Sequence, residues 1–195
     1  MNVFDEKFLL WLNGFAGRFG PVDDAARLLA SDYLIPLLIS LTLFGAWFAG
    51  RTPQAREFIQ RRVLVGAAAI GLSNAVIAGL NALWHRPRPF IPMGDELTLL
   101  FYAPTDPSFP ANPTAVGFAA VAALWRVDAR LRVGLVVVSL LLGFARVYGG
   151  VFYLTDIVAG AAVGVVVAYL TGWLFRFFDP ITGLFLRLCR AFALA

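Results

Sequence analysis

The chain has 195 residues; 60% of them are hydrophobic, only 14% are charged, and the mean hydropathy is +0.78. Soluble domains usually carry about 25% charged residues, so the composition excludes an ordinary soluble enzyme and predicts an all-α integral membrane protein. The net charge of +4 does not indicate a nucleic-acid partner, because basic residues in membrane proteins usually mark cytoplasmic loops. With one cysteine, Cys189, and one histidine, His85, the chain offers no internal disulfide and little histidine chemistry.

The apolar segments predict a helical bundle of about five transmembrane spans preceded by an N-terminal interfacial helix. Residues 3–19 place apolar side chains at helical spacing among charged ones, which is typical of a helix lying in the membrane interface. A span needs about 20 mostly apolar residues, and we expect spans at 33–49, 63–83, 114–125, 133–144 and 157–175. We therefore expect one membrane domain, with an interfacial segment at 1–32, a transmembrane bundle at 33–178 and an interfacial or cytoplasmic tail at 179–195.

The basic residues predict the orientation of this bundle. Ten of the sixteen fall in three segments, which are the connections between spans one and two and between spans three and four, and the tail. The positive-inside rule makes that side cytoplasmic. The N-terminal segment, the loop at 84–113 and the turn at 146–156 are then expected on the outer side.

Three ionisable residues stand at the outer ends of apolar segments. Arg88 lies in the proline-rich loop, Arg146 ends the fourth span and Asp156 opens the fifth. Such groups are costly near lipid and are usually paired or functional, and an arginine fork matches the oxygens of a phosphate. The alternative is an ordinary rigid loop whose two arginines, Arg86 and Arg88, lie at the lipid headgroups. We expect Asp156 to pair with Arg146 or Tyr148.

The fifth span also carries a helix-packing pattern. Asp156, Gly160 and Gly164 are spaced by four and share one helical face. The two glycines predict close approach of a neighbouring helix and a buried position for Asp156. Helix packing alone explains the glycines but leaves the acid unexplained.

At these positions the sequence resembles the type 2 phosphatidic-acid phosphatase superfamily, and most closely its small bacterial branch that includes undecaprenyl-diphosphate phosphatases. The family motifs are Lys-x6-Arg-Pro, Pro-Ser-Gly-His and Ser-Arg-x5-His-x3-Asp, and here they correspond to residues 81–89, 110–113 and 145–156. The resemblance implies a phosphatidic-acid phosphatase-like bundle, a multi-pass position in the bacterial inner membrane with the motif loops on the periplasmic side, and a lipid phosphate as ligand.

The motifs have lost the residues that carry the family chemistry. Arg88-Pro89, Arg146 and Asp156 match, whereas the remaining motif positions hold Asn81, Ala111-Asn112-Pro113, Ala145 and Phe152. The resemblance implies that a histidine at position 152 would attack phosphorus and a histidine at position 113 would protonate the leaving alcohol. Phenylalanine has no lone pair for attack and proline has no proton to donate. General acid–base help is typically worth about 10²–10⁴-fold in rate, and loss of the nucleophile costs more.

We therefore expect a catalytically silent, lipid-phosphatase-like membrane protein. It would bind an anionic lipid phosphate through Arg88 and Arg146, with Asp156, Asn81 and Asn112 in support, or serve as a subunit of a membrane complex. A partner could dock on the aromatic residues near the tail, although these are also typical of an interfacial belt: Trp173, Phe175, Phe177 and Phe178.

Two alternatives remain open on the sequence. An active lipid phosphate or diphosphate phosphatase would need displaced catalytic groups, such as His85 or Asp106. A lipid transporter would need a polar route across the bilayer, and the spans hold few polar residues to form such a route. Neither a metal site nor a cofactor is expected, because one histidine, one distant cysteine and scattered acids give no ligand cluster.

Overall fold

A computed structural model describes residues 3–192 of the protein. Residues 1–2 of the predicted interfacial segment and 193–195 of the predicted tail lie outside the described residues. Every regular element within 3–192 is a helix, in the order α1 (Val3–Asn13), α2 (Gly20–Leu29), α3 (Leu34–Trp47), α4 (Pro53–Leu83), α5 (Phe90–Met93), the 3₁₀ helix η1 (Gly94–Glu96), α6 (Asn112–Leu124), α7 (Ala129–Tyr148), α8 (Leu154–Phe177) and α9 (Asp179–Ala191). The predicted all-helical fold is confirmed.

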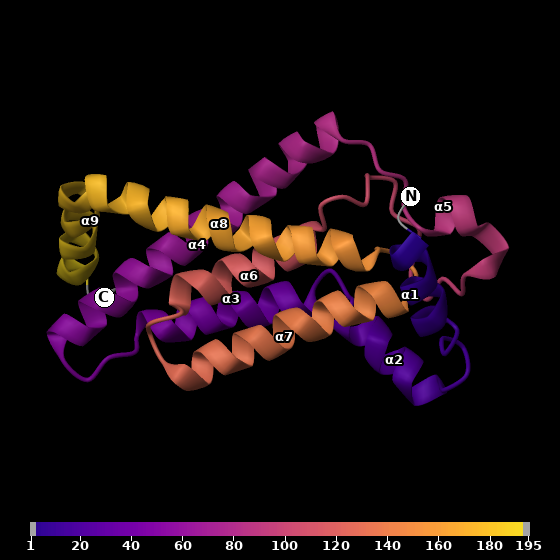
Figure 1. Cartoon of the computed structure of the whole chain (residues 1–195). Helices are drawn as coiled ribbons and strands as arrows, with labels where there is room; N and C mark the ends of the chain where they lie inside the picture. The colour runs from indigo at the N-terminus through magenta and orange to yellow at the C-terminus, as the bar shows by residue number, and fades with distance from the viewer. Residues whose placement is uncertain (1–2, 193–195) are drawn as a thin grey trace.

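Helix α6 lies at the centre of the bundle, packed between α4, α7 and α8, while α3 packs on α4 and α7 (Figure 1). Most of α6 is alanine or valine and is buried. Small side chains let the surrounding helices approach closely, as is typical of membrane bundles. The apolar core on the α3 side is built from Ile35, Ile39, Leu43, Val63, Ala120, Val121, Leu124, Leu135 and Leu142.

Each of the five predicted spans coincides with a helix, but the helices differ in length. Helices α4, α7 and α8 are each long and apolar enough to cross a membrane. Helices α2 and α3 pass the same test only together, as a pair bent by 51°. Helix α6 has 13 residues, which span about 20 Å and fall short of a hydrocarbon core of about 30 Å.

The ends of the long helices are set by caps that the hydropathy pattern does not show. Helix α4 begins at Pro53, ten residues before the predicted span, because the Thr52 hydroxyl accepts a hydrogen bond from the Ala55 N–H at 3.2 Å and proline favours the first helical turn. Asp128 caps α7 in the same way, accepting from the amides of Arg130 and Leu131. The basic residues expected in the connection before α4 therefore lie partly on its first turns.

The glycine pattern in α8 acts as predicted. A Cβ atom added at Gly160 would lie 2.2 Å from the Ala111 carbonyl oxygen, and one at Gly164 would lie 2.1 Å from the Ala115 carbonyl oxygen. Only glycine allows this approach of α8 to α6. The two helices are therefore in close contact along the first turns of α8 that follow Asp156. Asp156 itself is fully buried.

The connections gather at two opposite ends of the bundle (Figure 1). We call the end that carries α1, α5 and residues 84–111 the loop end, and the end that carries α9 the tail end. The connections at 48–52 and 125–128 lie at the tail end, as α9 does (Figure 1). The basic segments therefore share one end, as predicted. Prolines usually keep a loop extended and free of helix, yet the short helices α5 and η1 form within the loop at 84–113.

Candidate phosphate site at the loop end

Asp156 at the start of α8 is held by Arg86. Arg86 Nη1 donates to Asp156 Oδ1 at 2.6 Å and to Thr155 Oγ1 at 2.8 Å, while Arg86 Nη2 donates to Asp5 Oδ2 at 2.9 Å. The second oxygen of Asp156 accepts the backbone N–H of Tyr153 at 2.9 Å, which caps the helix. Arg86 also lies over the Tyr153 ring, with its guanidinium carbon 4.1 Å from the ring centre.

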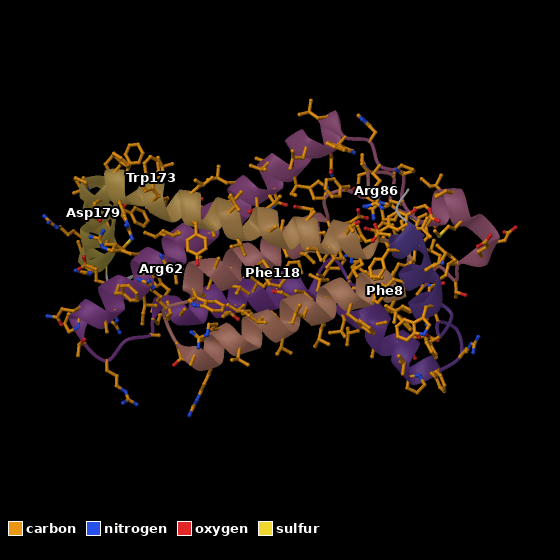
Figure 2. All side chains as sticks on the ribbon, in the orientation of Figure 1. Phe8, Arg62, Arg86, Phe118, Trp173 and Asp179 are labelled. Atoms are coloured by element: carbon orange, nitrogen blue, oxygen red, sulfur yellow. The ribbon has the colours of Figure 1, made fainter. Side chains whose placement is uncertain are left out.

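This pairing corrects the expectation that Asp156 binds Arg146 or Tyr148. Tyr148 instead donates to Asp23 at 2.7 Å, and Arg146 pairs elsewhere. Arg86 reaches Asp156 because the loop after α4 returns to the start of α8, and α1 delivers Asp5 to the same guanidinium. Figure 2 labels Arg86 at this end of the bundle. The two buried carboxylates share one cation, so Arg86 and Asp156 act as structural groups that join α1, the loop and α8.

Arg88 is buried and donates three hydrogen bonds within the protein. Its Nε and Nη2 donate to the carbonyl and carboxylate of Asp106, at 2.8 and 2.9 Å, and its Nη1 donates to the Val151 carbonyl at 3.3 Å. The guanidinium carbon lies 4.3 Å from the centre of the Phe152 ring. Burial lowers the pKa of Arg88, and the nearby charge of Arg146 acts in the same direction, whereas Asp106 opposes both.

Arg146 lines a cavity of about 300 Å³ beside α3, α4 and α6. Its Nη2 donates to Asp32 Oδ1 at 2.6 Å, and Tyr102 donates to the other oxygen of Asp32 at 2.6 Å. That hydrogen bond raises the pKa of the Tyr102 phenol. Arg146 Nε is buried and has no hydrogen-bond partner within residues 3–192. The rest of the cavity wall is largely apolar and includes Ile35, Ile39, Ile70, Val116 and Leu142.

Of the two asparagines expected to support the site, Asn112 lines the cavity and Asn81 does not. Asn112, at the start of α6, lines the same cavity and donates to Asn74 Oδ1 at 2.7 Å. Asn81, which stands at the family's lysine position, is two turns farther along α4 and is absent from the lining of this cavity in the described structure. Asn74 rather than Asn81 therefore brings α4 to the site.

The two residues considered as substitute catalytic groups lie outside the cavity. His85 is exposed and has no hydrogen-bond or ion-pair partner among residues 3–192. Asp106 is 60% exposed and is paired with Arg88. Within the same residues, no cluster of three metal-ligating side chains forms.

Several residues of the site did not emerge from the sequence. Asp32 lies two residues before Leu34, the first residue of the apolar helix α3, so the criterion that singled out Asp156 could have found it. Asp5 and Arg86 carry no such signal, because their contact joins positions 81 residues apart. The missed residues that contact predicted ones directly are Asp32, Asn74 and Arg86. Asp5 and Tyr102 contact Arg86 and Asp32 in turn.

The sequence model of the PAP2 superfamily matches residues 62–179, which is more than half of the chain. The chain belongs to the PAP2 superfamily. It is 28% identical over 172 residues to "Undecaprenyl-diphosphatase BcrC" from Bacillus subtilis (strain 168), covering 86% of this chain and 83% of that relative. The family and this relative place the protein among the PAP2-type, lipid-phosphatase-like membrane proteins.

Two solved structures share the fold. The crystal structure of Aquifex aeolicus LpxE superposes with a TM-score of 0.67 at 24% identity, covering 85% of this chain and 92% of that chain. The transmembrane PAP2-type phosphatidylglycerolphosphate phosphatase from Bacillus subtilis gives a TM-score of 0.61 at 20% identity, covering 90% and 84%. Both structures support the arrangement of the transmembrane helices.

The positions that correspond to the three PAP2 motifs converge at the loop end. Arg88 of the first motif lies on Phe152 of the third, and the Ala111 N–H of the second donates to the Asp156 carbonyl at 3.0 Å. Asn112 and Arg146 line one cavity. The arrangement holds two buried cations, each paired with an aspartate of this chain, and packs the Phe152 ring on one of them.

Proposed function

We propose that the protein is a catalytically silent PAP2 protein that binds the phosphate of an anionic membrane lipid through Arg146 and Arg88. The observation that carries this proposal is the ring of Phe152, which is buried on Arg88 at the position where the PAP2 family has its nucleophilic histidine. Pro113 occupies the position of the general acid. Neither side chain can form or break a bond to phosphorus. The guanidinium groups of Arg88 and Arg146 can still bind a phosphate group.

The charge arrangement supports exchange of a carboxylate for a phosphate. The Arg88 and Arg146 side chains are only 4% and 5% exposed, but the side chains of their partners Asp106 and Asp32 are 60% and 46% exposed. An aspartate can therefore turn into water while its arginine stays in place. A phosphate that enters would bind the vacated donors, including the unpartnered Nε of Arg146.

The cavity at Arg146 supports a lipid rather than a soluble phosphate. Most of its wall consists of apolar side chains from α3, α4, α6 and α7, which suit the first carbons of a lipid chain. The name of the Bacillus relative makes undecaprenyl diphosphate the first probe to use. We further propose that the loop end faces the periplasm of a bacterial inner membrane, because the tail end collects the basic residues.

The test combines binding with turnover in detergent. Purified protein, in molar excess over undecaprenyl diphosphate, should release no phosphate while retaining the lipid. Arg146→Gln should lose the lipid, and Arg130→Gln, which removes an exposed charge at the tail end, should keep it. Because replacing the buried Arg146 also tests folding, a second variant changes its partly exposed partner instead. Asp32→Asn should bind the lipid more tightly than the wild type does.

Two outcomes would overturn the proposal. Phosphate release that disappears in His85→Ala would establish the alternative of an active phosphatase with displaced groups. A stoichiometric membrane-protein partner, with no lipid bound in any variant, would instead establish the alternative of a subunit in a membrane complex.

A further inference from the structure

A second cavity, of about 430 Å³, lies at the tail end between α4, α6 and α8. Three arginines line it, namely Arg62 from α4, Arg126 from the connection after α6, and Arg176 from the end of α8. Its volume falls within the range of about 300–1,000 Å³ typical of small-molecule sites. Figure 2 labels Arg62 at the end of the bundle opposite Arg86, so this cavity is remote from the PAP2 motifs.

None of these three arginines has a carboxylate partner within residues 3–192. The acidic residues at this end are committed elsewhere: Glu57 pairs with Arg61 and Arg190, and Asp179 pairs with Arg61. Asp128 caps α7. Three like charges therefore line one cavity, whereas Arg88 and Arg146 at the loop end each have an aspartate.

Arg62 has one contact that explains part of its position. Its Nη2 donates to the Ala122 carbonyl at 3.3 Å, which satisfies a carbonyl at the end of α6. This helix cap uses one donor of five, and the buried Nε of Arg62 has no hydrogen-bond partner among the described residues. Arg62 therefore keeps donors that no described residue uses.

We propose that this cavity is a second anion site, which binds a phosphate group. Arginine forks match phosphate oxygens in charge and geometry, and the three come from different segments, so one phosphate would join them. Trp125, Tyr169 and Trp173 also line the cavity, and rings of this kind sit at the headgroup level of a bilayer. The phosphate can therefore be supplied by a phospholipid headgroup or by a soluble phosphate.

The experiment counts bound lipids by native mass spectrometry of the full chain, with phosphatidic acid as the probe and phosphatidylcholine as the comparison. The wild type should retain two phosphatidic acid molecules, one at each end. The double variant Arg126→Gln with Arg176→Gln should lose one of them. Loss of two charges should weaken that binding on the order of 30-fold. The matched control is Arg130→Gln with Arg187→Gln, which removes two exposed charges of the same end outside the cavity and should retain both lipids.

The loop-end variant Arg146→Gln separates the two sites, because it should lose only the other lipid. Equal losses in the cavity variant and the control would overturn the proposal, since they would indicate diffuse surface attraction. No loss in the cavity variant would overturn it as well. Inorganic phosphate distinguishes the sources: if it displaces the tail-end lipid at millimolar concentration, the site accepts free phosphate, and if it does not, the site takes the lipid headgroup.

Discussion

The guanidinium of Arg88 lies 4.3 Å from the centre of the Phe152 ring, and both side chains are buried. A cation over an aromatic face is attracted by the ring, so Phe152 stabilises the cation that PAP2 motif one contributes. The proposed silent function rests on this contact, because it keeps the Arg88 cation in place beside a ring that has no lone pair for attack on phosphorus.

Restoring only the two histidines should not restore catalysis. The double variant Phe152→His with Pro113→His still has Asn81, Ala145 and the altered second motif, and Arg88 loses its aromatic partner. We expect phosphate release from undecaprenyl diphosphate to remain at the level of the wild type. Turnover well above that level, measured as released phosphate, would show that the remaining positions already form a competent cradle.

Asp32→Asn should strengthen lipid phosphate binding. The change removes the carboxylate that pairs with Arg146 Nη2 at 2.6 Å and so removes the competing anion. Hydrogen bonds to charged groups contribute about 1.5–3 kcal/mol when buried, and because Asp32 is 46% exposed we expect the low end, roughly tenfold in affinity. Lipid titration followed by native mass spectrometry measures the gain. Asp24→Asn, an exposed pair of the same kind with Arg27, should change nothing, and an unchanged Asp32→Asn would contradict the exchange of carboxylate for phosphate.

Asp156→Asn should destabilise the loop end. The variant leaves Arg86 with one carboxylate instead of two and weakens the cap on α8. Breaking a buried pair usually costs about 3–5 kcal/mol, and the remaining Asp5 should reduce this to about 2–3 kcal/mol. Thermal unfolding in detergent should show a melting temperature several degrees lower than that of Asp24→Asn. Equal melting temperatures would mean that Arg86 does not depend on Asp156.

Gly164→Ala should disrupt the packing of α8 on α6. Its Cβ atom would lie 2.1 Å from the Ala115 carbonyl oxygen, so the helices must separate. A matched control is Gly79→Ala in α4, where a Cβ atom meets nothing within 4 Å. Unfolding measurements should show a lower melting temperature for the first variant only. If both variants unfold alike, the close approach of α6 and α8 is not what stabilises the bundle.

Local patterns were sufficient to predict the helices and the close approach of another helix to α8, but they did not identify α6 as that neighbour. Spacing by four placed Asp156 on the buried face of α8 together with Gly160 and Gly164, and the structure agrees. Helix ends were predicted less well, since the start of α4 depends on the hydroxyl of Thr52 rather than on hydropathy.

The pairing of charges could not be predicted from spacing. Arg86 and Asp156 are 70 positions apart, and their contact depends on how the loop after α4 crosses the end of α8. Arg146 had Asp156 ten residues away as an obvious candidate, yet it pairs with Asp32, 114 positions distant. In both cases the partner is decided by the packing of the helix ends.

The most direct test of a silent, phosphate-binding PAP2 protein is native mass spectrometry of the wild type after incubation with undecaprenyl diphosphate. The mass of the bound lipid reports binding and cleavage together. We predict a complex that contains the intact diphosphate and that is absent from Arg146→Gln. Conversion of the lipid to its monophosphate by the wild type but not by Arg146→Gln would contradict the account.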